Sequence, residues 1–120
     1  MMRFTEIFVA IAADPWLEVV NFYQALLSCE PTTYSKNHYA EFQSDGLKLG
    51  IFQPSPQHRT EFAPAAGALS LCLEVENLEK AIATIQTLGG TVQPDITQAS
   101  HGRECYAYDP VGNRLILHQK

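Results

Sequence analysis

The chain repeats the same order of structural signals at an interval of about 63 residues. The helix-capping residues Asp14 and Asn77 are 63 residues apart in the sequence. The prolines that open the next segment, Pro31 and Pro94, are also 63 residues apart. A glycine-containing turn then follows in both halves. Each half therefore predicts a strand, a helix and three further strands, with a small insertion in the second half.

One amphipathic helix is predicted in each half. The first is expected to be capped by Asp14, to have Pro15 at its first helical position, and to run to about Ser28. The second begins after Asn77 and ends at 89–90, a Gly-Gly pair. In both, apolar residues recur at helical spacing, which places them on one face.

Strands are predicted where apolar and polar residues alternate or where a short apolar run lies between turn signals. The segment from Ile7 to Ala13 fits a single buried strand. Alternation or turn-bounded apolar runs predict further strands over 47–52, 69–75, 102–108 and 114–118. Because neighbouring positions on a strand point to opposite faces, each of these strands has one core side.

The whole chain, residues 1–120, is predicted to be one domain made of two modules. The modules cover about 3–53 and 67–120, and a proline-rich connector covers about 54–66. Halves of this size bury little surface alone, so we expect them to be stable only when packed together, within the chain or across a dimer.

Composition limits the classes of partner and the location. No apolar run approaches the roughly 18 residues that a membrane-crossing helix needs, and no export signal opens the chain, so a cytoplasmic location is expected. The net charge of −5, with scattered basic residues, disfavours nucleic acid. The three cysteines Cys29, Cys72 and Cys105 contain no CxxC pair and are expected to be reduced thiols.

Three segments of the chain resemble the vicinal oxygen chelate superfamily. They are the closing segment 101–117 with its Asp-Pro-Val-Gly-Asn sequence, the helix segment 21–27, and the segment 73–79 at the start of the second half. That superfamily contains glyoxalase-type lyases, extradiol dioxygenases, epimerases, fosfomycin-inactivating thiol transferases and bleomycin-binding resistance proteins. The resemblance implies an α+β fold, in which two βαβββ modules in tandem form curved mixed sheets with a helix on each outer face.

The resemblance also implies where a divalent metal would be held, on the first and fourth strands of each module. The matching positions are Phe8, Gly50, Ser70 and Ile116. Counting from the helix cap would give Ile7 instead of Phe8, but Phe8 leaves Ile7, Val9 and Ile11 together on the core face. None of the four matching side chains is a useful ligand for a borderline divalent ion. We therefore expect the usual metal site to be absent, and the concave surface to be more apolar and, at Gly50 and Ser70, roomier.

Several side chains are candidates to line a ligand cavity on that concave surface. The candidates are Phe8, Gly50, Phe52, Ser70, Cys72, Glu104, Tyr106, Tyr108 and Ile116. Glu104, Tyr106 and Tyr108 alternate on one strand face, where they could line a cavity, pack on the sheet or form a dimer interface. Cys72 is the one thiol expected on this surface, and the alternative is an inert small residue.

Two alternatives concern charged residues near the end of the chain. His118 and Glu74 share strand parity with the concave face and could hold a metal through atypical ligands. The competing interpretation, which the position near the C-terminus favours, is a frayed and solvated His118 with Glu74 as a rim carboxylate. His101 or Arg103 could form a lip that meets an anionic ligand, or simply a polar turn around Gly102.

These observations predict a metal-free protein that binds or sequesters a small, partly aromatic organic molecule, without a cofactor and without an assigned catalytic residue. A homodimer is expected by similarity to the bleomycin-type binders, with the cavity in one chain or between two. Two other functions stay open. One is a metal-dependent lyase or dioxygenase with atypical ligands, and the other is an interaction subunit without a small-molecule pocket.

Overall fold

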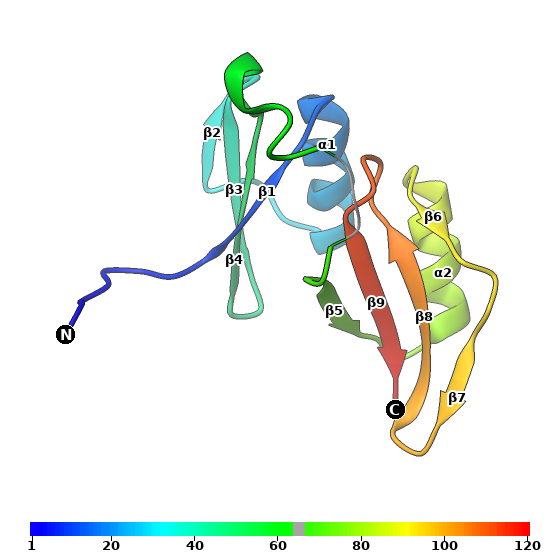
Figure 1. Ribbon diagram of the computed structural model, residues 1–120. Helices are drawn as coiled ribbons and strands as arrows, with labels where there is room; N and C mark the ends of the chain where they lie inside the picture. The colour runs from blue at the N-terminus through cyan, green and yellow to red at the C-terminus, as the bar shows by residue number, and fades with distance from the viewer. Residues whose placement is uncertain (64–66) are drawn as a thin grey trace. The chain divides into compact units, whose positions relative to one another are not determined.

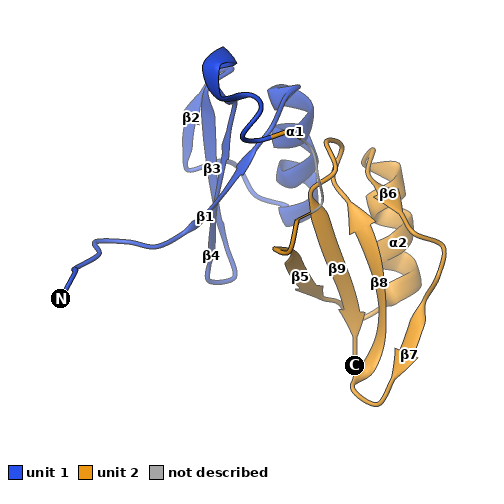
Figure 2. Ribbon diagram, viewed as in Figure 1, with its two compact units in different colours: residues 1–62 blue, residues 63–120 orange. Residues whose placement is uncertain are grey.

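The structure is a computed structural model that describes residues 1–63 and 67–120, so part of the predicted connector lies outside the described residues. The chain divides into two compact units, residues 1–62 and residues 63–120 (Figure 2). Each unit contains one α-helix and one mixed sheet among its described residues. The division falls within the proline-rich segment.

The first unit has the element order strand, helix, strand, strand, strand (Figure 1). Its elements are β1 (Val9–Ala12), α1 (Trp16–Leu27), β2 (Thr33–Ser35), β3 (Tyr39–Ser44) and β4 (Leu47–Phe52), and a short 3₁₀ turn (Pro56–His58) follows them. The sheet order is β1-β4-β3-β2. β1 runs parallel to β4, whereas the other pairs are antiparallel.

The core of the first unit lies between α1 and one face of its sheet. The fully buried side chains come from both layers: Trp16, Val19, Val20, Phe22, Tyr23, Ala40, Phe42, Leu49 and Ile51. Trp16 also donates a hydrogen bond from its indole Nε1 to the carbonyl oxygen of Ile51 at 3.0 Å. Trp16 is therefore part of the packed core of this unit.

The hairpin between β3 and β4 is closed by an Asp-Gly turn, which is the glycine-containing turn predicted for the first half. Asp45 and Gly46 both have positive φ angles, 51° and 81°. This is the type I′ geometry, whose backbone twist matches that of the strands it joins. The turn therefore fixes the register in which Glu41 lies opposite Gly50.

The second unit repeats this order and adds one short strand. Its elements are β5 (Leu71–Glu74), α2 (Leu78–Thr87), β6 (Thr91–Val92), β7 (Thr97–Ala99), β8 (Gly102–Tyr108) and β9 (Arg114–Gln119). The sheet order is β5-β9-β8-β6, and β7 also pairs with β8. β5 is parallel to β9, as β1 is to β4. The tandem βαβββ fold class is confirmed.

The core of the second unit again lies between helix and sheet. The buried apolar side chains are Leu78, Ile85, Cys105, Ala107, Leu115 and Leu117. The Asp-Pro-Val-Gly-Asn turn before β9 is held by Asp109, which is 2% exposed. Its carboxylate accepts hydrogen bonds from the backbone of Val111 and Asn113, both at 3.0 Å, and from the Asn113 side chain at 2.8 Å.

Two local predictions are wrong. α1 is not capped by Asp14, because the helix begins one residue later and Pro15 takes the N-cap position without a side-chain hydrogen bond. Asp14 instead pairs with Arg59 at 3.1 Å. The first strand is neither long nor buried. β1 covers four residues at the edge of its sheet, with β4 as its one partner among the described strands, and Ile7 lies before it and is 79% exposed.

The other helix start is as predicted. Asn77 is the N-cap of α2, and its side chain accepts a hydrogen bond from the backbone of Lys80 at 2.9 Å. Neither α1 nor α2 is long and apolar enough to cross a membrane, and no other helix in the described part of the chain is either.

Candidate functional site

Each sheet has one face covered by its helix and one open face, and the open face is defined here by strand parity. In the second unit, Cys105, Ala107, Leu115 and Leu117 are buried on the helix side. The alternate residues Cys72, Glu74, Glu104, Tyr106, Tyr108, Ile116 and His118 therefore share the open face. Most of the candidates predicted for the second half are gathered there.

Three of these candidates form a cross-strand row in the middle of the open face. Ile116 of β9 lies opposite Cys72 of β5 on one side and opposite Tyr106 of β8 on the other. Tyr106 is 42% exposed. Burial, helped by the carboxylates of Glu74 and Glu104, raises the pKa of the Cys72 thiol. The thiol is therefore protonated at neutral pH and is a weak nucleophile.

Ser70 and Tyr108 lie near the end of the sheet at which β9 begins. Ser70 precedes β5, and its hydroxyl accepts a hydrogen bond from Arg114 Nη1 at 3.3 Å. Tyr108 lies opposite Arg114 in the β8–β9 register and accepts a hydrogen bond from the Gln93 side chain at 3.1 Å. The guanidinium beside Ser70 repels a cation, so this position does not suit a metal.

On the open face of the first unit, Gly50 does not create the predicted room. A Cβ added to Gly50 would lie 2.6 Å from the hydroxyl oxygen of Tyr39, whose ring covers this position. The prediction of a roomier surface at Gly50 is wrong, because the tyrosine on the adjacent strand occupies the space that the missing side chain leaves.

The two phenylalanine candidates of the first unit also have close partners. Lys48 Nζ lies 5.1 Å from the ring centroid of Phe8, a cation–π contact. Phe52 packs edge-to-face on Phe62, with ring centroids 5.0 Å apart. Phe8 thus lies against a residue of the open face, whereas Phe52 is partly covered by the segment that follows β4.

A network of charged and polar groups crosses this open face. The Tyr39 hydroxyl donates to Glu41 Oε1 at 2.8 Å, and Lys48 Nζ lies 3.3 Å from the other Glu41 oxygen and 2.7 Å from Glu6. Burial and the hydrogen bond to Glu41 raise the pKa of Tyr39 to about 12. The hydrogen bond from Tyr39, together with Lys48, lowers the pKa of Glu41. The charge of Lys48 is therefore already balanced within the unit.

Tyr39 should ionise with a midpoint near pH 12 in a phenolate absorbance titration, since the folded state holds its pKa at about 12. Because the folded pKa is above the ordinary value of 10.0, the stabilisation is complete below pH 10 and is lost as the pH rises toward 12. Glu41→Gln should lower the midpoint, because it removes a negative charge beside the hydroxyl. Tyr39→Phe identifies the transition, and a Tyr39 midpoint near pH 10 would contradict the network.

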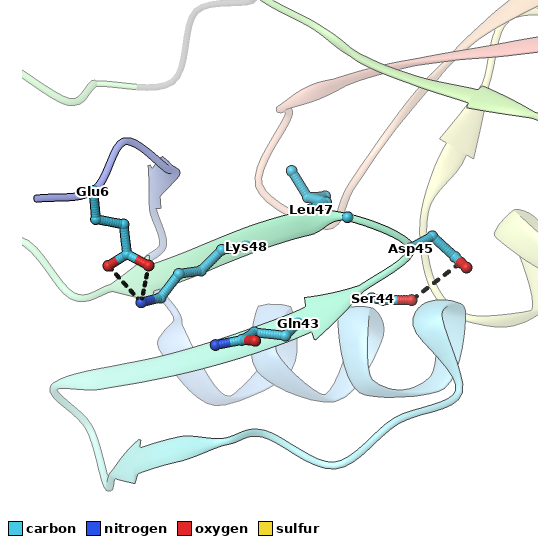
Figure 3. Close-up of a pocket in the computed structure, with 7 residues that line it drawn as sticks. Glu6, Gln43, Ser44, Asp45, Leu47 and Lys48 are labelled. Carbon is cyan, nitrogen blue, oxygen red and sulfur yellow. Dashed lines mark hydrogen bonds and ion pairs between the residues drawn. The ribbon is translucent and has the colours of Figure 1, made fainter.

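A pocket of about 340 Å³ lies near the β3–β4 turn in the first unit (Figure 3). It is lined by Glu6, Gln43, Ser44, Asp45, Gly46, Leu47 and Lys48. In Figure 3 the side chains of Glu6 and Lys48 meet in an ion pair, and Ser44 donates to Asp45 at 3.2 Å. The lining is polar and internally paired, which does not suit an aromatic ligand.

A second cross-strand row in the second unit consists of ionisable side chains. His118 of β9 lies opposite Glu74 of β5 and Glu104 of β8. His118 Nδ1 is 2.5 Å from Glu74 Oε1, and its Nε2 is 2.9 Å from His101 Nδ1. The interpretation of His118 as frayed and solvated is wrong: it is only 8% exposed, because His101 stacks on its ring and β9 continues to Gln119.

Of the two residues proposed as a lip, only His101 joins this row. Arg103 lies opposite Gln119 and forms a two-pronged ion pair with Glu79 of α2, at 2.6 and 2.9 Å. The Arg103 guanidinium lowers the pKa of Glu79 to about 2. Arg103 is therefore committed to the helix side of the sheet, and its proposed role toward an anionic ligand is wrong.

Sequence reasoning missed two features of the site. Parity placed His118 and Glu74 on one face, but nothing in the local pattern indicated that His101, in the turn between β7 and β8, would reach them. Tyr39 was likewise missed. A register count through the Asp45-Gly46 turn would have placed Glu41 opposite Gly50, and Tyr39 two residues away on the same face.

The comparisons with known proteins agree with one another on the fold. A sequence model described as a glyoxalase-like domain matches residues 7–118. No curated protein sequence matches the chain.

Solved structures match along nearly the whole chain. A glyoxalase-related enzyme from Fulvimarina pelagi has 14% identity and a TM-score of 0.76, over 98% of this chain and 89% of that one. The fosfomycin resistance protein FosX from Listeria monocytogenes has 17% identity and a TM-score of 0.76, over 99% and 95%. A glyoxalase/bleomycin resistance protein/dioxygenase family enzyme from Burkholderia phytofirmans has 14% identity and a TM-score of 0.76, over 93% and 95%. At these identities the likeness concerns the fold alone.

Proposed function

This chain belongs to the glyoxalase-like domain family, and we propose that it binds a small, partly aromatic organic molecule without a metal at Phe8, Gly50, Ser70 and Ile116. Two physical facts count against a metal at these positions. Phenylalanine, glycine and isoleucine have no donor atoms, and the Ser70 hydroxyl is held by Arg114. The proposal therefore concerns binding rather than metal-assisted turnover at those positions.

The observation that carries the proposal is the row formed by Cys72, Ile116 and Tyr106 on the open face of the second sheet. It offers a flat aromatic ring and two small or aliphatic side chains, with hydrogen-bonding groups one row away. Ligand sites combine apolar walls with a few polar groups in this way. A half-exposed tyrosine can both stack on a ring and form a hydrogen bond.

We propose further that the active form is a homodimer. Several large apolar side chains are exposed in the single chain, among them Ile7, Phe8 and Leu69, at 79%, 42% and 91%. Exposed apolar side chains of this size are candidates for burial in a protein interface. A second copy would also bury surface that two units of about 60 residues leave open.

Tyr106→Ala should lower the affinity for the bound compound about tenfold, which corresponds to the roughly 1.4 kcal/mol of a lost aromatic contact. The compound is first sought by thermal shift among aromatic antibiotics, catechols and thiol conjugates, in buffer containing a chelator. Isothermal titration of the best compound then measures the affinity, and sedimentation of the same samples gives the oligomeric state.

Tyr106→Phe is the matched control, because it keeps the ring and should keep most of the affinity. If no chemical class raises the melting temperature in chelator, the binding proposal fails, and silence that persists with added divalent metal favours an interaction subunit. A second function, a metal-dependent lyase or dioxygenase with atypical ligands, is favoured by the histidine and carboxylate row beside Tyr106. It predicts that binding in the thermal-shift screen requires added divalent metal.

A further inference from the structure

We propose that His101, Glu104 and His118 form a binding site for a divalent transition-metal ion, with Zn²⁺ as the reference ion. In this site Glu74 does not bind the ion but orients the His118 ring, from the neighbouring strand opposite to that of Glu104. The site goes beyond the binding function proposed above and uses none of the four positions at which the resemblance would place a metal. Among residues 1–63 and 67–120, these three side chains are the group whose ligand atoms converge within 4.8 Å.

The sheet register brings the carboxylates to the histidine. β9 lies between β5 and β8, so His118 has Glu74 directly opposite on one strand and Glu104 on the other. Side chains directly opposite one another on a sheet face lie about 5 Å apart at Cβ. This row is two residues, or about 7 Å, along the strands from the row that contains Ile116.

His101 is supplied by the turn between β7 and β8. Gly102 begins β8, and Figure 1 shows this turn at the same end of the unit as the C-terminus that follows β9. The His101 and His118 rings are stacked, with centroids 5.0 Å apart and planes inclined by 26°. An exposed turn residue thus closes over a histidine that is itself 8% exposed.

The distances suit an ion after a small movement. Zn²⁺ binds imidazole nitrogen and carboxylate oxygen at about 2.0–2.2 Å, so tetrahedral ligand atoms lie roughly 3.4 Å apart. His101 Nδ1 and His118 Nε2 are 2.9 Å apart, and all three ligand atoms lie within 4.8 Å. The required adjustment is about 1 Å, which the exposed His101 turn can provide by side-chain rotation.

Glu74 selects the nitrogen of His118 that faces the site. A carboxylate can only accept, so the 2.5 Å contact requires His118 Nδ1 to donate. In a neutral ring Nε2 then carries the lone pair, and without metal it accepts the proton on His101 Nδ1. An ion displaces that proton from His101 Nδ1, and the neutral His101 ring then carries its one proton on Nε2 instead. Metal-bound histidines commonly use this second-shell carboxylate arrangement.

Charge also favours a cation. Glu74 and Glu104 place two carboxylates around two imidazoles, of which the His118 ring is buried. The nearest basic residue in the sequence, Arg103, points to the other side of the sheet and is paired with Glu79. A divalent ion would balance the two carboxylates. Two histidines and one carboxylate suit Zn²⁺, Fe²⁺, Co²⁺ or Ni²⁺, and three protein ligands leave positions open to water or to a ligand oxygen.

The test uses untagged full-length protein stripped with a chelator and titrated with Zn²⁺ by calorimetry and with Co²⁺ by visible absorption. One ion per chain is expected. His101→Ala and Glu104→Gln should each weaken binding more than about 100-fold, and Glu74→Gln about 10–100-fold, as for other second-shell carboxylates. His101 is exposed and Glu104→Gln keeps the side-chain shape, so both variants should fold, which circular dichroism checks.

His38→Ala is the matched control, because His38 is an exposed histidine of the first unit. This variant should bind Zn²⁺ and Co²⁺ with the affinity of the unchanged protein. Absence of Zn²⁺ and Co²⁺ binding would overturn the proposal. So would binding that survives in both His101→Ala and Glu104→Gln. The aromatic-ligand screen is run with chelator, so its outcome does not depend on this site.

Discussion

Gly102→Ala is expected to lower the free energy of unfolding of the chain by about 3–5 kcal/mol. Gly102 has a φ of +132°, which side chains with a Cβ rarely adopt. The added Cβ would also lie 2.2 Å from the backbone carbonyl oxygen of Gln119. Backbone cannot rotate away as a side chain can, so β8 and β9 would have to separate where they begin to pair. Urea denaturation followed by circular dichroism measures the loss.

Gly46→Ala is the matched control for this substitution. Gly46 also has a positive φ, +81°, but a Cβ there would meet nothing within 4 Å. Its cost is therefore the left-handed conformation alone, about 1–2 kcal/mol. Equal losses for the two variants would show that the close approach of Gly102 to Gln119 is unimportant.

Much of the fold could be predicted because the signals are local. Alternation and flanking turns gave the bounds of β4 and β8, and Asn77 marked the start of α2. The helix cap at Asp14 was wrong because the helix begins one residue later, with Pro15 at the N-cap position. The Asp14 carboxylate pairs instead with Arg59, 45 residues away, and a local pattern contains no information on such a partner.

The candidate site shows the same division. Strand parity and the family resemblance made His118 and Glu74 candidates for the concave face, and parity grouped Glu104 with Tyr106 on one face of their own strand. Which of them lie opposite one another depends on pairing between strands that are far apart in the sequence. Burial of His118 depends in turn on His101, a residue of a turn. The sequence therefore indicated the members of the site but not their contacts.

Trp16→Ala should destabilise the chain by about 3–5 kcal/mol, the usual loss for a fully buried aromatic residue. Trp16 is 2% exposed, and its ring centroid lies 5.4 Å from that of Tyr34. Its indole also donates a hydrogen bond to the carbonyl oxygen of Ile51. Trp16→Phe keeps an aromatic ring but leaves the Ile51 carbonyl without this donor, so a smaller loss of about 1–3 kcal/mol is expected.

The Trp16 variants also test whether the two units fold together. The unfolding of both units in urea is followed by circular dichroism. Tryptophan fluorescence cannot be used, because Trp16 is the one tryptophan of the chain and the variants remove it. Units of about 60 residues are marginal alone, so one shared transition should move to lower urea. A transition of residues 63–120 that stays in place while that of residues 1–62 moves would contradict this dependence. An unchanged midpoint in Trp16→Ala would contradict the role of Trp16 in the core.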